Sequence, residues 1–332
     1  MKLRGVVLSV MLVLALLAAP LGADAQQPGK VPTIGYLVQF SGAAGPPNTN
    51  LTAFLEGLRD LGYVDGKTIA IEYRYTEGKS ERLPELAAEL VRLKVDLIVT
   101  ETGVAALRAK DATQTIPIVM EGSADAVTQG LVASLARPGG NVTGLTDLSP
   151  AVGGKRLQLL AEVVPKLTQV GVLTPGGPAA EREWTETQAM AQPLQVQLTS
   201  LKIGGAADFP GVFAEAARQN LQALVLFDIG GMSTPAVRAQ LVALAAQHRL
   251  PMMFQGPGAV RQGGLMGYGS DGLDMCRRAA TYVDRILKGA NPAELPVGQP
   301  TKFILAINLK AAKALDLTIP PSVLSQANVV IE

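Results

Sequence analysis

The chain has 332 residues, of which 48% are hydrophobic and 17% charged, and its formal net charge is +1 at pH 7. This length and composition exclude a disordered chain and are sufficient for two ordinary α/β domains. Aromatic residues make up only 4% of the chain and its charges are balanced, so it offers no broad electrostatic surface for nucleic acid or an acidic membrane. We therefore expect a small molecule or another protein as the partner.

The first 25 residues have the pattern of a secretory signal peptide. Lys2 and Arg4 precede an apolar run over 6–19, and Ala23-Asp24-Ala25 resembles a cleavage site. The run is shorter than the roughly 18 to 20 residues that a membrane-spanning helix needs. No cysteine follows it that could carry a lipid, and we expect the single Cys276 to be a buried apolar residue without a disulfide. The segment predicts export to the periplasm.

The first half of the remaining chain alternates predicted strands and helices. Strands are expected over 33–38, 69–75, 96–100 and 116–120, and helices from about 50 and over 83–93 and 103–112. A further helix is expected to end at Arg137, before Pro138-Gly139-Gly140, and a short strand to follow it near Val142. This order predicts a mostly parallel sheet covered by helices on both faces.

The second half repeats the scheme. Strands are expected over 169–173, 195–201, 223–227 and 250–254, and helices near 182–190, 209–219 and 235–247. The segment 263–268 echoes 139–144 and is interpreted as a return crossing. A helix over 273–287 then rejoins the first lobe, and 302–308 crosses once more into the second.

Several phrases, in this order, resemble the substrate-binding proteins of bacterial ABC transporters of the tryptophan/tyrosine type. They include Phe54-Leu55-Glu56-Gly57-Leu58, Leu61-Gly62-Tyr63, Ser134-Leu135-Ala136-Arg137-Pro138-Gly139-Gly140-Asn141, Gly154-Lys155-Arg156-Leu157, Gly263-Gly264-Leu265-Met266 and Ile307-Asn308-Leu309-Lys310. The resemblance implies a type I periplasmic binding fold: two Rossmann-like α/β lobes joined by a three-segment hinge, with a small ligand in the cleft between them. Its lobes would be 31–146 with 268–300, and 147–267 with 301–332.

Ligands of open α/β sheets bind beyond the C-terminal ends of the strands, so the candidate ligand-binding residues follow the predicted strands. In the first lobe they are Phe40, Ser41, Thr100, Glu101, Thr102, Gly103, Ser123 and Asp125. In the second lobe and at a crossing they are Thr174, Asp228, Phe254, Gln255 and Tyr268.

The segment Thr100-Glu101-Thr102-Gly103 has the clearest chemistry. A helix N-terminus offers free N–H groups and a positive dipole, hydroxyls add donors, and Gly103 allows close approach, which together suit a ligand carboxylate. The alternative is that Thr102 only caps the helix. Glu101 departs from the resembled family, which usually has small residues at this position. Its carboxylate would repel an anion if it pointed inward, pair with an ammonium group, or face solvent.

The other candidates also have structural alternatives. Asp228 fits a ligand ammonium group or a turn beside Gly230, and Asp125 is favoured as an N-cap for a helix at Val127. Phe40, Phe254 and Tyr268 could stack on a flat ligand, but aromatics beside strands are more often core residues, and Phe254 is favoured as one.

Enzyme chemistry finds no support in the sequence. His248 is the only histidine, and Gly267-Tyr268-Gly269-Ser270-Asp271-Gly272 lacks the first glycine of a nucleophile elbow at the required position. One histidine and one cysteine exclude the usual zinc ligand sets, and no calcium-loop or phosphate-loop spacing is present. We predict no catalytic residue, metal or cofactor.

The resulting prediction is an exported solute-binding protein of an ABC importer. It would bind a small organic ligand, an amino acid or an aromatic carboxylate, by hinge closure about 144–147, 267–268 and 299–301. Its second partner would be an ABC permease in the inner membrane, and it would act as a monomer. The alternative is a periplasmic ligand sensor that reports to a membrane receptor or signalling system.

Overall fold

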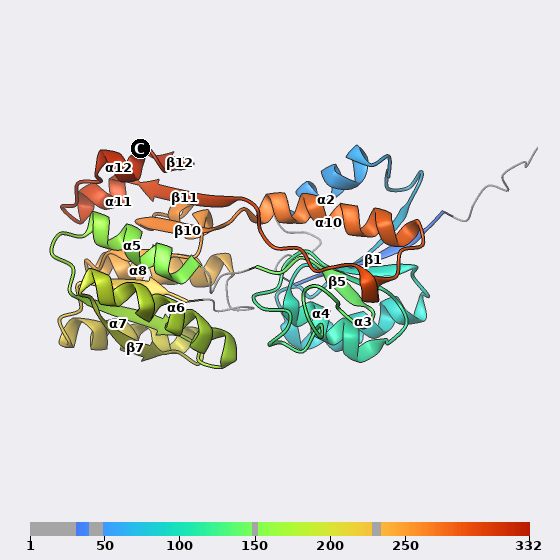
Figure 1. The fold of residues 1–332 in the computed structure, drawn as a ribbon, viewed down its shortest axis with the longest axis horizontal. Coiled ribbons are helices and arrows are strands. Elements are labelled where there is room, and N and C mark those ends of the chain that lie inside the picture. The colour runs from blue at the N-terminus through green and yellow to red at the C-terminus, as the bar shows by residue number, and fades with distance from the viewer. Residues whose placement is uncertain (1–30, 40–48, 148–151, 228–233) are drawn as a thin grey trace, which may run out of the picture. The chain divides into compact units, whose positions relative to one another are not determined.

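The structure, a computed structural model, describes residues 31–39, 49–147, 152–227 and 234–332. Within these residues the strands form a five-stranded and a seven-stranded sheet, each with helices of its own (Figure 1). Among the described residues, every helix is too short or too polar to cross a bilayer.

The first sheet has the strand order β2-β1-β3-β4-β5, and all of its pairings are parallel. Its strands are β1 (Thr33–Val38), β2 (Ala70–Tyr75), β3 (Leu97–Thr100), β4 (Ile118–Met120) and β5 (Val142–Gly144). Helices α2 (Thr49–Asp60) and α10 (Gly272–Leu287) cover one face, and α3 (Leu83–Arg92) and α4 (Gly103–Ala112) cover the other. Two short 3-10 turns, η1 (Ser80–Arg82) and η5 (Pro292–Glu294), flank them.

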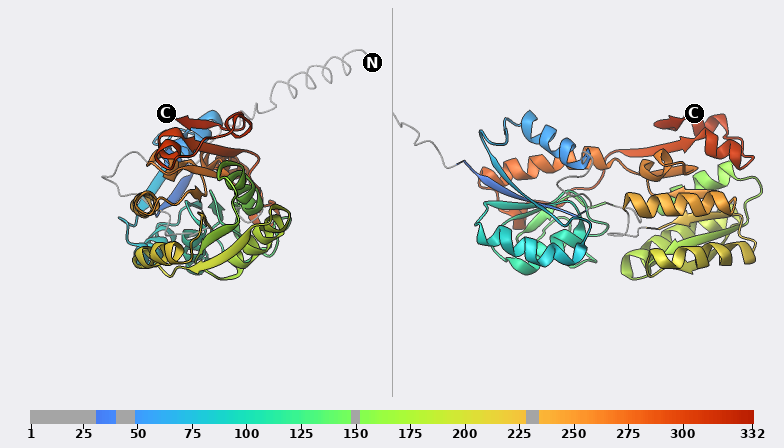
Figure 2. Two further views of the ribbon diagram at one scale, coloured as in Figure 1. Left: turned by 90° about the vertical axis from the view of Figure 1, so that its left-hand side faces the viewer. Right: turned by 180° about the vertical axis from the view of Figure 1, so that it is seen from behind.

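Helix α10 joins this sheet although the chain has by then passed through most of the second one. It lies beside α2 in both figures (Figures 1 and 2). Their apolar faces meet the sheet through Phe54 and Leu58 of α2 and Ala279 and Val283 of α10, all of which are buried. Gly57 of α2 permits the close approach of α2 to α10, because a Cβ there would lie 2.3 Å from the carbonyl oxygen of Arg277 in α10.

The second sheet has the order β12-β11-β10-β9-β8-β6-β7, with β10 and β11 antiparallel. Its strands are β6 (Gln169–Thr174), β7 (Gln197–Lys202), β8 (Ala223–Leu226), β9 (Met252–Phe254), β10 (Met266–Ser270), β11 (Phe303–Asn308) and β12 (Val329–Ile331). Helices α5 (Gly153–Val163), α6 (Pro178–Leu194), α11 (Leu309–Ala314) and α12 (Pro321–Leu324) pack on one face. Helices α7 (Phe209–Arg218), α8 (Pro235–Gln247) and α9 (Pro257–Arg261), with the turn η3 (Ala206–Asp208), pack on the other.

The predicted α/β class is confirmed, but the helix expected to end at Arg137 is absent. Gly130 has a φ of +69°, and the backbone N–H groups of Leu131 and Val132 both donate to the carbonyl of Ala126, which closes a turn. The carbonyl of Leu135 accepts from the N–H of Val297, so the segment is held as irregular backbone. The apolar spacing that predicted a helix reflects burial of these side chains without helical pairing.

The crossings between the sheets also differ from the prediction at one point. The chain passes from one sheet to the other between β5 and α5, between β10 and α10, and between η5 and β11. The segment 263–268 was expected to cross, but Met266–Ser270 is strand β10 of the second sheet. The crossing comes later, at Asp271, whose carboxylate caps α10 by accepting from the N–H groups of Leu273 and Asp274.

A buried ion pair lies beside the first two crossings on the side of the second sheet. Arg156, in the first turns of α5, is 0% exposed, and its Nη1 lies 2.7 Å from Oε1 of Glu183 in α6, which is 1% exposed. Its Nε donates to the carbonyl of Tyr268 in β10 at 2.7 Å. One side chain therefore joins two helices and a strand.

Removing one partner of this pair should cost far more stability than removing both. Glu183→Ala leaves an uncompensated buried guanidinium, so we expect the free energy of unfolding to fall by about 3–5 kcal/mol. The double variant Arg156→Met with Glu183→Met replaces the pair by apolar groups and should lose clearly less. Urea unfolding followed by circular dichroism measures both, and equal losses in the two proteins would contradict the prediction.

Candidate functional site

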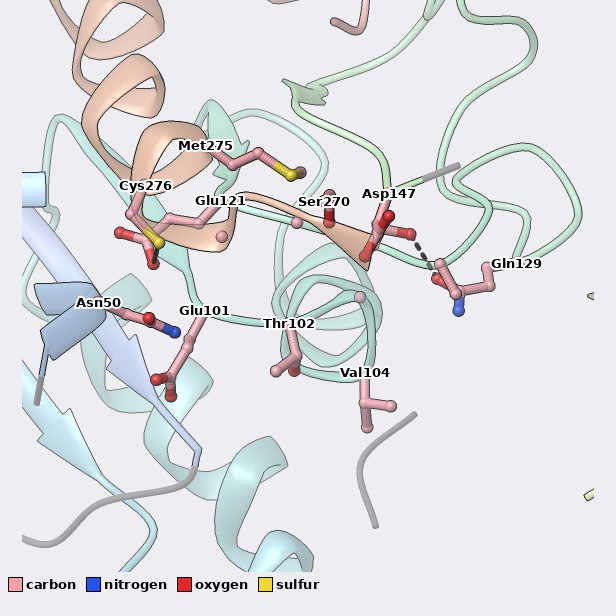
Figure 3. A pocket seen from close by; sticks show the side chains of 15 residues that line it. Asn50, Glu101, Thr102, Val104, Glu121, Gln129, Asp147, Ser270, Met275 and Cys276 are labelled. Atoms are coloured by element: carbon pink, nitrogen blue, oxygen red, sulfur yellow. Dashed lines mark hydrogen bonds between the residues drawn. The ribbon is translucent and has the colours of Figure 1, made fainter. Parts of the chain in front are cut away.

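A cavity of about 210 Å³ lies where β3 and β4 end. Its wall is formed by residues 101–104 after β3, residues 121–124 after β4, and residues from the end of β10 and the start of α10, which are Ser270, Gly272, Met275 and Cys276 (Figure 3). Asn50, Gln129 and Asp147 complete the lining. Because parallel strands place their C-terminal ends at one edge of a sheet, segments far apart in the sequence converge here.

Glu121 is the most buried polar group of this lining. It follows β4, is 2% exposed, and accepts a hydrogen bond from the Tyr36 hydroxyl at 2.8 Å. The Cys276 thiol approaches its second oxygen at 3.5 Å. Burial raises the pKa of Glu121 well above its ordinary value, and the nearby charge of Glu101 acts in the same direction, against these two hydrogen bonds. The carboxyl group therefore stays protonated well above the pH at which an exposed glutamate ionises.

The neighbours of Glu121 respond to the same environment. Burial raises the pKa of Tyr36 and of the Cys276 thiol, and the charges of Glu121 and Glu101 raise both further. The thiol is thus a neutral, buried group, as expected for Cys276 from the sequence. A buried thiol of raised pKa is a poor nucleophile.

Glu101 follows β3 as Glu121 follows β4, and it lies in the same cavity. Its side chain is 8% exposed, and Oε2 accepts the backbone N–H of Gln39 at 2.9 Å. This bond ties the end of β3 to the end of β1. Glu101 therefore lies against the cavity wall, which excludes the solvent-facing orientation among those left open by the sequence.

Thr102 is the N-cap of α4. Its Oγ1 accepts the N–H of Ala105 at 3.1 Å and donates to Oε1 of Gln39, so the cap expected as an alternative is present. The close approach allowed by Gly103 is used by the protein itself, because a Cβ there would lie 2.3 Å from Oε1 of Gln129 and 3.0 Å from Oγ of Ser123. A ligand role for Thr102 and Gly103 remains a prediction.

The remaining first-lobe candidates have structural contacts as well. Ser123 lines the cavity and its hydroxyl donates to Oε1 of Gln129 at 2.7 Å. Asp125 caps through Oδ1, which accepts the N–H groups of Val127 and Thr128, although the segment it caps is a turn and not the expected helix. Thr100 is fully buried in β3 outside the lining, and its hydroxyl has no hydrogen-bond partner in the described part of the chain.

The second-sheet candidates do not join this cavity. Phe254 and Gln255 line a separate cavity of about 170 Å³ with Arg238, and Phe254 is packed in the core between the sheet and α7 and α8, as favoured from the sequence. Tyr268 stacks on Phe303 with ring centroids 5.9 Å apart, and Thr174 accepts the N–H of Gly176. Phe40, Ser41 and Asp228 lie outside the described residues.

Four of the candidates therefore share one cavity: Glu101, Thr102, Gly103 and Ser123. Glu121 was not selected as a ligand-binding candidate, although it directly follows β4 as Glu101 directly follows β3. Cys276 reaches Glu121 from 155 residues away in the sequence, and only the return of α10 to the first sheet places it there. Within the described ranges, no group of three or more His, Cys, Asp and Glu side chains is placed to hold a metal ion.

Comparison with known proteins identifies the family. Residues 48–331 match the model of the family described as ABC transporter substrate binding protein. The chain belongs to this family. The resemblance drawn from the sequence phrases is thereby confirmed, and so is the prediction of a binding protein in place of an enzyme, because the family consists of substrate-binding proteins. Substrate-binding proteins of ABC transporters are extracellular or periplasmic.

Individual relatives agree with the family match. The chain is 27% identical over 270 residues to the Tyrosine-binding protein of Clostridioides difficile (strain R20291), covering 80% of this chain and 75% of that protein. A solved structure of a conserved domain protein from Vibrio cholerae is 27% identical, with a TM-score of 0.80 over 91% of this chain and 100% of that chain. The ABC domain in complex with L-Trp from Streptococcus pneumonia is 25% identical, with a TM-score of 0.79 over 90% and 99%. These neighbours confirm the predicted periplasmic binding protein fold.

The cap at Thr102 gives a stability prediction for the substrate-binding protein. Thr102→Ala removes the acceptor for the Ala105 N–H, so we expect the free energy of unfolding to fall by about 1 kcal/mol. Thr102→Ser keeps the hydroxyl and should retain most of the stability. Urea unfolding measures both variants, and equal stability of the alanine and serine proteins would show that the hydroxyl does not stabilise α4.

Burial of Glu121 gives a pH prediction. Between the ordinary glutamate pKa of 4.5 and the raised pKa of folded Glu121, the folded protein binds more protons than the unfolded chain. Its contribution to stability is therefore complete at low pH and is lost as the pH rises, with a slope of at most about 1.4 kcal/mol per pH unit. In the Glu121→Gln protein, the free energy of unfolding should fall less steeply with rising pH, over a range of about three pH units above pH ~5.

The control for this measurement is the same substitution at an exposed site. Glu85→Gln on α3 should leave the wild-type pH slope in place. Thermal unfolding across the pH range compares the three proteins. A Glu121→Gln protein with the full wild-type slope would show that Glu121 is ionised in the folded state.

Proposed function

We propose that this chain is the exported binding protein of an ABC importer and that it captures a small organic ligand, an amino acid or an aromatic carboxylate. The cavity after β3 and β4 is the observation that carries the proposal. It lies at the strand ends where α/β proteins bind small ligands, in a chain of the substrate-binding family. The relatives named for tyrosine binding and solved with L-Trp support amino acids as the first ligands to test.

Capture by hinge closure belongs to the same proposal. Two lobes would close over the ligand. Their cores are residues 31–146 and 147–267, and the C-terminal segments complete both. The second crossing would lie at Asp271, because β10 belongs to the second sheet. The first and third crossings are paired, since the N–H of Thr146 donates to the carbonyl of Gly298 and the N–H of Gly298 to the carbonyl of Gly144. Paired segments would bend together, which supports a single hinge axis.

The cellular setting follows from the N-terminal sequence. Residues 1–25 would direct export and be removed, so that the mature chain acts in the periplasm as a monomer. Its closed, ligand-bound form would be the one recognised by an ABC permease in the inner membrane. Only the closed form would contact the ligand from both lobes, so binding would shift the population towards it.

A thermal-shift screen with a cavity-filling variant tests the proposal. A ligand that binds only the folded state at about 100 times its dissociation constant stabilises by about 2.7 kcal/mol, so the melting temperature of the mature protein should rise by several degrees. Gly272→Leu adds a side chain to the cavity lining, where a Cβ meets nothing within 4 Å, and should abolish the shift.

The matched control is Gly211→Leu. Gly211 lies in the first turn of α7, where a Cβ also meets nothing within 4 Å, and it is far along the chain from the cavity lining. This variant should keep the shift. If no amino acid, amine or aromatic acid stabilises the wild-type protein, or if both leucine variants respond alike, the proposed site is wrong.

A further inference from the structure

A second cavity, of about 440 Å³, lies at the opposite edge of the second sheet from its ligand-binding candidates. It is lined by Met252, where β9 begins, and by Leu265, just before β10, whereas Phe254 and Gln255 lie where β9 ends. Its volume is about twice that of the cavity after β3 and β4. It falls within the range of about 300–1,000 Å³ that is typical of small-molecule sites.

Small residues on two helices leave this space open. Helices α8 and α11 pack on opposite faces of the sheet, and the cavity lies between them at the sheet edge. Ala245 and Ala246 line it from α8, and Ala311 and Ala314 line it from α11. Four larger side chains at these positions would fill the cavity.

The floor of the cavity is apolar. Leu250, Met252 and Leu265 are 7%, 1% and 3% exposed. Asn308 is the uncharged polar residue of the described lining, and the protein uses its side chain as a helix cap. Its Oδ1 accepts the N–H of Ala311 at 3.0 Å, and its Nδ2 donates to a backbone carbonyl of α9 at 3.4 Å. A molecule bound here therefore meets hydrocarbon in the interior.

The mouth of the cavity is basic. Arg249 and Lys310 are exposed, and none of the described lining residues is Asp or Glu. Arg249 pairs with Asp316 at 2.6 Å, but the two side chains are 61% and 85% exposed. Lys310 donates to a main-chain oxygen of Glu332, which is also exposed. Exposed contacts of this kind add little stability, so a ligand carboxylate can exchange with both partners at low cost.

We propose that this cavity is a second binding site, which takes an organic monoanion with an aliphatic body. Its carboxylate would pair with Arg249 and Lys310 at the mouth, and its hydrocarbon would cover the apolar floor. Burial of hydrocarbon supplies the attraction, and charge-assisted hydrogen bonds to the two cations select the head group. The site shares no lining residue with the cavity after β3 and β4, so it goes beyond the proposed function.

Probes that differ in one property test this class. Octanoate has the body and the charge, 1-octanol has the body alone, octylammonium has the opposite charge, and acetate has the charge alone. Calorimetry and thermal shift measure each against the mature protein, at concentrations at which octanoate is monomeric. We expect octanoate to bind and to raise the melting temperature. Octanol should bind at least about tenfold more weakly, and octylammonium and acetate should not bind.

A pair of tryptophan variants locates the site. Ala246→Trp places a large side chain in the mouth from an exposed position of α8, and it should abolish octanoate binding. Ala243→Trp is the matched control, because Ala243 is an exposed residue of the same helix outside the lining. It should bind octanoate as the wild-type protein does. The melting temperatures of the unliganded variants show whether both are folded.

A pair of double variants assigns the head-group recognition. Arg249→Gln with Lys310→Gln should weaken octanoate binding at least about tenfold, to the level of octanol. The control is Lys313→Gln with Arg261→Gln. It removes the same two charges from exposed positions outside the lining and should leave the affinity unchanged.

The outcomes separate this inference from the proposed function. If octanoate does not bind, if octanol or octylammonium binds as tightly, or if both tryptophan variants behave alike, the second site is wrong. Gly272→Leu, which fills the cavity after β3 and β4, should leave octanoate binding intact. If it abolishes that binding, octanoate occupies the other cavity, and this inference fails while the proposed function stands.

Discussion

The parallel pairing of β1, β3 and β4 is the constraint on which the site depends. It brings Gln39, Glu101 and Glu121, which follow these strands, to one edge of the first sheet. The Gln39 N–H donates to the carboxylate of Glu101, and the N–H of Glu121 donates to the carbonyl of Thr100 at the end of β3. Helix α10 closes the arrangement from above, because its apolar face packs on the sheet and carries Cys276 to Glu121. The presence of Glu101 and Glu121 in one cavity is thus a product of backbone topology.

Keeping a carboxyl group where Glu121 lies works against stability at neutral pH. A buried acid must either stay protonated or find a counter-charge, and the described part of the cavity lining offers none from a side chain. An apolar residue at this position would avoid the penalty. Such local costs are typical of functional sites, where a group is retained for what it does to a ligand.

Much of the fold could be predicted from the sequence because periodicity and turn residues agree there. The alternation of strands and helices in both halves follows from local patterns, and the ends of β3 and β4 followed from buried runs of apolar residues. The helix predicted before Pro138 is absent because Leu131 and Val132 are buried at helical spacing without helical hydrogen bonds. Burial produces such spacing in irregular backbone as well, and a sequence pattern cannot separate the two.

The site was predicted only as far as strand ends could be located. Glu101 and Ser123 follow this rule, whereas Met275 and Cys276 enter the cavity through α10, whose place on the first sheet is a long-range property. Thr102 and Asp125 are capping residues, and the chemistry that makes a residue a good cap also makes it a plausible ligand contact. Hydrogen-bond partners are needed to distinguish the two uses.

The position of Arg156 has a mechanical consequence. Its guanidinium group holds the carbonyl of Tyr268 in β10, close before the second crossing, from the first turns of α5, close after the first crossing. The two connections to the first sheet therefore leave the second sheet from a common anchor. If the lobes close as proposed, a torque on one connection would be shared by the other, so the two connections would turn together and not twist independently.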